Sequence, residues 1–308
     1  MILSILIAIL IVFTIVFSIF LHFASEYAFK EAFYARRKTK EDSIKRLNNW
    51  GLWNEEYFEN LQMEDVFITS KDGLNLCGHL IERFEDSNRY IILVHGYSAN
   101  HYLHMPFIPM FLKERFNILL VEERSHGESE GKYATYGYKE KEDLNLWINF
   151  LEERKGEELF LGLHGQSMGA ATVLLCGARN RKVKFVIEDC GYSSGKELMR
   201  YQFSKVDYVP FGLVYWLLNL KVKRRCGFKF EDVCPINAIA KSEVPIFFIH
   251  GDADKKVPVN MAIDMYKRRN REGDMILIVP NAVHLTSYKE KKEEYERMVH
   301  DFINNADI

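Results

Sequence analysis

The stretch FLGLHGQSMGAATVLLC, residues 160–176, joins an apolar run to a small-residue segment of helical character, with one serine at the junction. Ser167 lies two residues from a glycine on each side, Gly165 and Gly169. Glycines at these positions leave room for neighbouring backbone beside a sharply turned chain. A strand that turns this tightly into a helix lifts the serine hydroxyl above the sheet, as in a nucleophile elbow. We therefore expect Ser167 to be a nucleophile; the alternative is a glycine-rich turn with an ordinary serine.

Short apolar runs and segments of helical spacing alternate on both sides of this stretch. Runs of this kind are typical of strands buried in a parallel sheet. Two strands joined at the turn Lys71–Gly73 are expected within 63–83, and six more at 90–96, 117–123, 158–165, 184–190, 244–251 and 275–280. Helices are expected at 102–115, 139–154, 168–180, 258–271 and 287–304. The alternation predicts an α/β fold with a mainly parallel, eight-stranded sheet flanked by helices.

A serine hydroxyl is a weak nucleophile, so it needs a general base, and the base needs an orienting carboxylate. His284 follows the last predicted strand by four residues and precedes the last predicted helix, so we expect it to be the base. Asp254 and Asp252 both follow the preceding strand. Asp254 lies further into the loop and is the preferred acid, with Asp252 as the second choice. Three other histidines lie in loops at the same edge and stay open as substrate contacts: His101, His104 and His126.

Two backbone N–H groups are needed to hold the oxyanion of an acyl-transfer reaction. The residue after the nucleophile, Met168, supplies one, and the positive end of the following helix points at the same place. The loop after the strand 90–96 supplies the other, and Tyr97 is the natural donor there. We therefore predict an oxyanion hole formed by the backbone of Tyr97 and Met168. This chemistry needs no metal or other cofactor, and none is expected.

One interval between predicted strands, 192–240, is too long for a simple crossover. It contains an aromatic and apolar stretch that ends in a basic cluster, Lys221–Arg225. Loops at the carboxyl ends of α/β strands commonly build ligand pockets. We interpret 192–240 as a helical cap over the site; an extra packing helix with a solvated basic end is the alternative.

The N-terminal residues 2–21 carry no charge, and about 20 apolar residues suffice to cross a bilayer as a helix. The stretch lacks the basic start and small-residue cleavage site of a signal peptide. We expect a transmembrane anchor at 1–24, a helical linker at 25–61 and a globular body at 62–308. Basic residues follow the anchor, which favours a body on the cytoplasmic side. They are Lys30, Arg36, Arg37, Lys38, Lys40, Lys45 and Arg46.

Composition narrows the function classes. The formal net charge of −2 gives no indication of a nucleic-acid partner. The five cysteines are irregularly spaced and form no C-x-x-C motif, so neither a zinc site nor a disulfide framework is indicated. Free thiols are expected, although Cys226 and Cys234 could pair.

Several motifs together resemble the α/β-hydrolase superfamily, and more narrowly the membrane-anchored bacterial hydrolases described as cell-surface hydrolases. They span about 62–304 and read LVHGYSAN (93–100), EERSHGESEG (122–131), GLHGQSMGAA (162–171), CPINAIAKSEVPIFFIHGDADKKVPV (234–259) and PNAVH (280–284). The resemblance implies a serine hydrolase with nucleophile Ser167, acid Asp254 and base His284, oxyanion donors at Tyr97 and Met168, and a variable cap at 192–240. Glu123 and Ser125 depart from the family's usual pattern, which affects packing after a strand.

Three functions remain open at this stage. The first is a serine esterase that cleaves acyl or lipid-like esters through an acyl-enzyme, because an anchor and an apolar cap suit such substrates. The second is a peptidase, since HGxxDxxVP loops also occur in hydrolases similar to prolyl oligopeptidase. The third is a binding protein that has lost its activity, although the chain keeps all three triad residues. Acyl transfer to an alcohol stays possible for the first.

Overall fold

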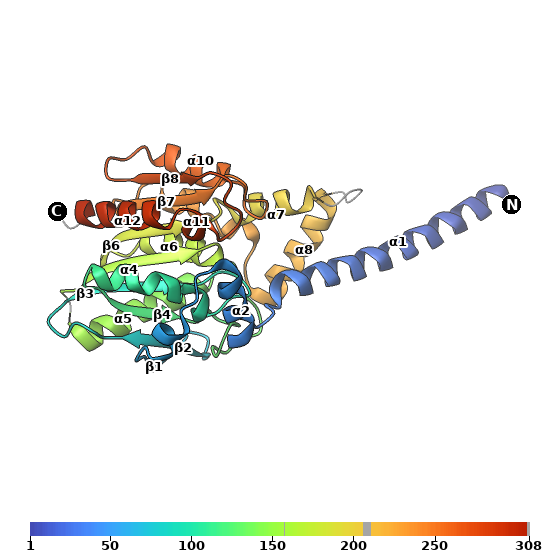
Figure 1. Cartoon of the computed structure of the whole chain (residues 1–308). Coiled ribbons are helices and arrows are strands. Elements are labelled where there is room, and N and C mark those ends of the chain that lie inside the picture. The colour runs from blue at the N-terminus through green and yellow to red at the C-terminus, as the bar shows by residue number, and fades with distance from the viewer. Residues whose placement is uncertain (157, 206–210, 307–308) are drawn as a thin grey trace.

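The described residues, 1–156, 158–205 and 211–306 of this computed structural model, form one eight-stranded sheet (Figure 1). The order is β1-β2-β4-β3-β5-β6-β7-β8. Strand β2 runs antiparallel to both of its neighbours, β1 and β4, and every other pairing in the sheet is parallel. The strands are β1 Glu64–Thr69, β2 Asn75–Ile81, β3 Arg89–Val94, β4 Asn117–Val121, β5 Phe160–Gln166, β6 Val183–Asp189, β7 Ile246–Gly251 and β8 Met275–Val279. The predicted mainly parallel sheet is confirmed.

Helices cover both faces of the sheet because side chains alternate along each buried strand. Ile91 of β3 packs in one cluster with Phe111 and Phe302, whereas its neighbour Ile92 packs on the other face in a cluster with Trp147. The helices on these faces are α4 Ile108–Lys113, with the 3₁₀ turn His101–Phe107 before it, α5 Glu140–Lys155, α6 Met168–Gly177, α10 Asn260–Arg269, α11 Ser287–Glu290 and α12 Lys292–Ala306. The fold is that of the α/β-hydrolases.

The predicted cap is helical. Its elements are α7 Gly195–Phe203, α8 Phe211–Cys226, the 3₁₀ turn Phe230–Asp232 and α9 Pro235–Ile239. Residues 206–210 of the predicted cap lie outside the described residues. All five cysteines lie within the described ranges and are free thiols, so Cys226 and Cys234 do not pair.

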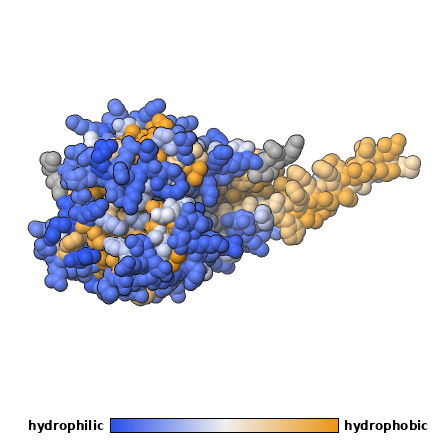
Figure 2. All heavy atoms as spheres, in the orientation of Figure 1, coloured by the Kyte–Doolittle hydropathy of each residue, from blue (hydrophilic) through white to orange (hydrophobic). Residues whose placement is uncertain are grey.

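Helix α1, Ile2–Phe33, runs without interruption through the boundary expected at residue 24 (Figure 1). Among the described residues it is the one helix long and apolar enough to cross a membrane, and its apolar part is exposed (Figure 2). Its last turns differ from the rest, because Ser25, Phe29 and Phe33 are buried. The described part of the linker adds two short helices, α2 Lys40–Trp50 and α3 Glu55–Glu59.

The end of α1 docks on the cap helix α8. Glu26 forms ion pairs with Lys221 (2.8 Å) and Arg225 (2.7 Å), and Phe29 and Phe33 belong to an apolar cluster with cap residues. These two cations come from the basic cluster that the sequence places at the end of the cap. That cluster is therefore partly neutralised by α1, which argues against the alternative of a packing helix with a solvated basic end.

Candidate active site

The chain turns at Ser167 as an elbow between β5 and α6. Ser167 has φ 56° and ψ −112°, a backbone conformation that L-residues rarely adopt. A Cβ at Gly165 would lie 2.3 Å from the carbonyl oxygen of Gly169, and one at Gly169 would lie 2.1 Å from that of Val94. The atoms in the way are backbone, which cannot rotate aside. Glycine is therefore sterically required on both sides of the serine.

The structure brings Ser167, His284 and Asp254 together from three separate loops. The distance from His284 Nε2 to Ser167 Oγ is 2.9 Å, and His284 Nδ1 lies 2.6 Å from Asp254 Oδ2. A carboxylate only accepts hydrogen bonds, so we infer that Nδ1 carries the proton. Nε2 is then an acceptor for the serine hydroxyl, as a general base must be.

Asp254 is held by more than His284. Its Oδ1 accepts hydrogen bonds from the backbone N–H of Lys256 (2.7 Å) and Val257 (3.0 Å), and His250 Nε2 lies 3.4 Å from Oδ2. Burial alone would raise the pKa of Asp254, but hydrogen bonds from His250 and His284 outweigh it and keep the pKa below its ordinary value. Asp254 is therefore ionised at neutral pH.

Asp252, the second choice for the acid, has a different partner. It is exposed, and its Oδ1 accepts a hydrogen bond from the backbone N–H of Asn281 at 2.6 Å. This contact ties the loop after β7 to the loop after β8. The geometry thus favours Asp254 over Asp252 as the partner of His284.

The two expected oxyanion donors flank the serine. Met168 begins α6, and Tyr97 follows β3 after Gly96, where a Cβ would lie 3.1 Å from Ser167 Cβ. The loop that carries Tyr97 is held from below, because Ser98 N–H donates to His126 Nε2 at 2.9 Å. Its backbone therefore passes close over the nucleophile.

A cavity of about 210 Å³ opens beside the serine. Its walls come from the elbow, the loop after β3, the cap helix α7 and the loops after β7 and β8. The lining residues are Arg46, Gly96, Tyr97, Tyr136, Ser167, Met168, Tyr192, Leu198, Met199, Gln202, Lys256, Val257, His284 and Leu285. A concave, largely apolar pocket with a few convergent polar groups is the usual form of a small-molecule site.

A model of the prolyl oligopeptidase family matches residues 128–306, a range that contains Ser167, Asp254 and His284. The chain belongs to the prolyl oligopeptidase family. The protein YqkD of Bacillus subtilis (strain 168) is 31% identical over 274 residues, which cover 88% of this chain and 89% of YqkD.

Solved structures agree with this family and confirm the α/β-hydrolase fold. The Pyrococcus furiosus esterase Pf2001 is 25% identical, with a TM-score of 0.66 over 82% of this chain and 95% of that one. The Pyrococcus horikoshii acylaminoacyl peptidase, 17% identical with a TM-score of 0.60, covers 82% of this chain and 43% of its own. At that identity the second likeness supports the fold alone.

The three histidines left open as substrate contacts lie away from the lining of this cavity. His101, His104 and His126 are all buried, and none lines the cavity beside Ser167. They belong to the interior that supports the loops. Burial lowers the pKa of His126 to about 3, which keeps its Nε2 available to accept the hydrogen bond from Ser98.

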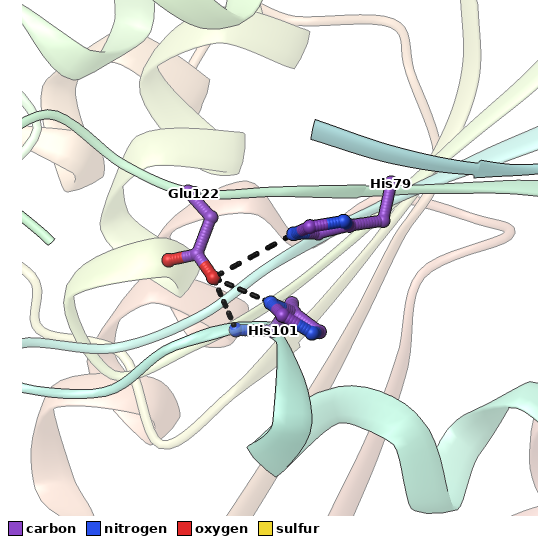
Figure 3. A group of neighbouring side chains, drawn as sticks. All are labelled: His79, His101 and Glu122. Atoms are coloured by element: carbon purple, nitrogen blue, oxygen red, sulfur yellow. Dashed lines mark hydrogen bonds and ion pairs between the residues drawn. The ribbon is translucent and has the colours of Figure 1, made fainter. Parts of the chain in front are cut away.

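A cluster of three side chains lies near the loop that carries Tyr97: His79, His101 and Glu122 (Figure 3). The spacing of these residues in the sequence does not reveal it. One ligand-type atom from each lies within 4.8 Å of the others. Asp65 holds the proton on His79 Nδ1 (2.8 Å), which leaves His79 Nε2 as an acceptor, 3.9 Å from both Cys77 Sγ and Glu122 Oε1.

The same cluster is already joined by hydrogen bonds. His101 donates to Glu122 Oε1 from its backbone N–H (3.2 Å) and from Nδ1 (2.5 Å). A metal ion here would have to replace the Nδ1 proton. The cluster as it stands fixes the start of the 3₁₀ turn that follows the Tyr97 loop.

Two further carboxyl groups lie behind the candidate site, at the end of β6. Glu188 accepts a hydrogen bond from Gly191 N–H (2.9 Å), and Asp189 accepts one from the Gln166 side chain (2.8 Å). Burial raises the pKa of Glu188 to about 7 and that of Asp189 to about 6. These groups therefore titrate near neutral pH.

Proposed function

We propose that the protein is a serine hydrolase that cleaves carboxylic esters of acyl or lipid-like type. The observation that carries the proposal is the chain of contacts from Ser167 Oγ through His284 to Asp254, with distances of 2.9 Å and 2.6 Å. The likeness to the esterase Pf2001 supports the choice of an ester bond.

In the proposed reaction His284 Nε2 takes the hydroxyl proton as Ser167 Oγ attacks the acyl carbon. The backbone N–H groups of Met168 and Tyr97 hold the oxyanion of the tetrahedral intermediate. His284 then gives its proton to the leaving alcohol, and an acyl-enzyme remains on Ser167. Water, activated by His284, attacks the acyl-enzyme and releases the acid and the free serine. Asp254 keeps the imidazole in the required tautomer throughout.

Peptide cleavage is the second candidate, and membership of the prolyl oligopeptidase family favours it. The same triad cleaves either bond, because an amide follows the same acyl-enzyme route with a poorer leaving group. The two candidates therefore differ in the substrate that the cavity accepts.

We also propose that α1 is retained as a single-pass anchor and that the body lies on the cytoplasmic side. Exposed apolar residues along α1 and the basic residues after it support this arrangement. Residues 25–61 then connect the anchor to the catalytic body at 62–308.

The test is labelling of the detergent-purified protein with a fluorophosphonate, followed by turnover of p-nitrophenyl esters of increasing chain length and of acyl-peptide p-nitroanilides. We expect labelling and ester turnover in the wild type and neither in Ser167→Ala, which should fold normally. Preference for the anilides would favour the peptidase. A folded wild type that is neither labelled nor active would overturn the hydrolase proposal and favour a binding protein.

A further inference from the structure

The cavity beside Ser167 presents positive charge without a compensating carboxylate. Besides His284, its charged lining residues in the described part of the chain are Arg46 and Lys256, and no Asp or Glu lines it. Asp254 lies behind His284 and is occupied by that contact. A ligand in this cavity therefore meets cations from two separate elements, helix α2 and the loop after β7.

Arg46 comes from the linker helix α2, outside the range matched by the family model. No carboxylate among the described residues lies within ion-pair distance of it, whereas Arg124, for comparison, contacts both Asp72 and Asp143. The guanidinium lies 4.8 Å from the centre of the Trp50 ring, a contact that positions it without neutralising it. A partly buried cation without a counter-ion is unfavourable, and an anionic ligand removes that cost.

Helix α2 is fixed firmly enough to hold Arg46 in place. Thr39 caps its start, and Leu47 is fully buried against Ala99 and Leu103. Ser43 Oγ donates to Asn100 Oδ1 at 2.7 Å in a buried hydrogen bond. These contacts attach α2 to the loop that carries Tyr97, so the cation and the expected oxyanion donor share one support.

Lys256 reaches the cavity from the loop after β7. Its backbone N–H donates to Asp254 Oδ1, which fixes this residue next to the acid partner of His284. The rest of the wall is apolar or neutral, with Leu198, Met199 and Gln202 from α7. Arginine pairs with carboxylate and phosphate oxygens through two parallel hydrogen bonds, and lysine adds a single positive charge.

We propose that this cavity is a site for esters that carry an anionic group, a carboxylate or a phosphate, and that Arg46 binds this group with help from Lys256. This inference rests on the proposed serine-hydrolase function and names its substrate class. The anion lies on the acyl or the leaving part of the substrate, within reach of Arg46 while the ester carbon is at Ser167.

The test compares two esters of equal acyl length, p-nitrophenyl butanoate and mono-p-nitrophenyl succinate, which differ by a terminal carboxylate. We expect wild type to prefer the succinate ester in kcat/KM, and Arg46→Gln to lower the ratio of the two kcat/KM values about 10- to 100-fold, the range for a lost hydrogen bond to a charged group. Arg46→Lys should lose less of the ratio. Lys45→Gln removes the same charge from an exposed neighbour on α2 and should change the ratio less than about twofold, as surface charges do.

Binding without turnover gives an independent readout. Glutarate and inorganic phosphate should each raise the melting temperature of wild type and not that of Arg46→Gln. The larger rise identifies whether a carboxylate or a phosphate is the preferred anion. Without ligand, Arg46→Gln must melt within a few degrees of wild type, which excludes unfolding as the cause of a missing rise in melting temperature.

The outcomes separate the two proposals. A ratio unchanged in Arg46→Gln, or equal stabilisation of both proteins by the anions, overturns the anion site while ester turnover supports the hydrolase. If neither ester is cleaved and the fluorophosphonate does not label Ser167, the hydrolase proposal fails. Stabilisation by anions that depends on Arg46 would then still support the site.

Discussion

Replacing Asp254 with Asn changes a single heavy atom, an oxygen to a nitrogen, and should nearly abolish turnover. Asp254 Oδ1 accepts two backbone hydrogen bonds, from Lys256 and Val257, so the amide oxygen of Asn will occupy that position. The amide NH₂ then faces His284 Nδ1, now 2.6 Å from Oδ2. Because NH₂ only donates, Nδ1 must become the acceptor and the imidazole proton moves to Nε2. Nε2 then points a hydrogen at Ser167 and cannot take its proton.

We expect this wrong tautomer to lower kcat by about 10⁴-fold, equivalent to about 5 kcal/mol of barrier. The measurement is kcat with the best p-nitrophenyl ester, with circular dichroism to check folding. Asp252→Asn is the matched control: its carboxylate accepts from Asn281 N–H, an interaction that an amide oxygen retains. Activity within about threefold of wild type is expected for this exposed position. If Asp254→Asn kept more than a tenth of wild-type activity, or if Asp252→Asn lost more activity than Asp254→Asn, the assignment of the acid would be refuted.

Two further predictions concern the elbow and the buried carboxyl behind it. Gly169→Ala places a Cβ 2.1 Å from the Val94 carbonyl oxygen, so the start of α6 must move by about 1 Å and kcat/KM should fall at least about 100-fold. Gly212→Ala is the control: its Cβ meets nothing within 4 Å, so its kcat/KM should equal that of wild type. Equal kcat/KM in the two variants would contradict the steric argument. Burial raises the pKa of Glu188 from 4.5 to about 7, so the folded state holds a proton that the unfolded state releases, and stability is full below about pH 4.5 and falls as pH rises toward 7. Glu188→Gln removes this titration and should be more stable than wild type by up to about 3 kcal/mol at pH 8, with little difference at pH 4.5. Urea unfolding at both pH values measures the stability difference. A wild type at least as stable as the variant at pH 8 would contradict the prediction.

Local sequence patterns were sufficient for the sheet and the elbow. Apolar runs of strand length, such as 90–96 and 244–251, became β3 and β7 because burial on both faces favours apolar side chains along the strand. The spacing of Gly165 and Gly169 around Ser167 specified the turn, since only backbone-to-backbone contact demands glycine on both sides.

Contacts between distant segments could not be read in this way. Arg46 was visible only as one of several basic residues after the anchor, because no local pattern brings α2 to the cavity. His79, His101 and Glu122 converge from separate elements, so their spacing in the chain carries no signal. The choice between Asp252 and Asp254 rested on position in the loop, and the partners that separate them became apparent in three dimensions.

The continuity of α1 has a consequence for how far the catalytic centre can reach. A helix of 32 residues is about 48 Å long, and its first 20 residues account for about 30 Å, the thickness of the hydrocarbon core. The remaining turns end at Phe33, whose ring lies 5.5 Å from that of Tyr136, a wall of the cavity. If residues 2–21 cross a bilayer as proposed, the continuous helix joins the body to the membrane more rigidly than a flexible linker would. In the proposed anchored arrangement, the length of α1 therefore sets how far the cavity lies above the lipid surface, and the proposed ester substrates would be those presented near that height.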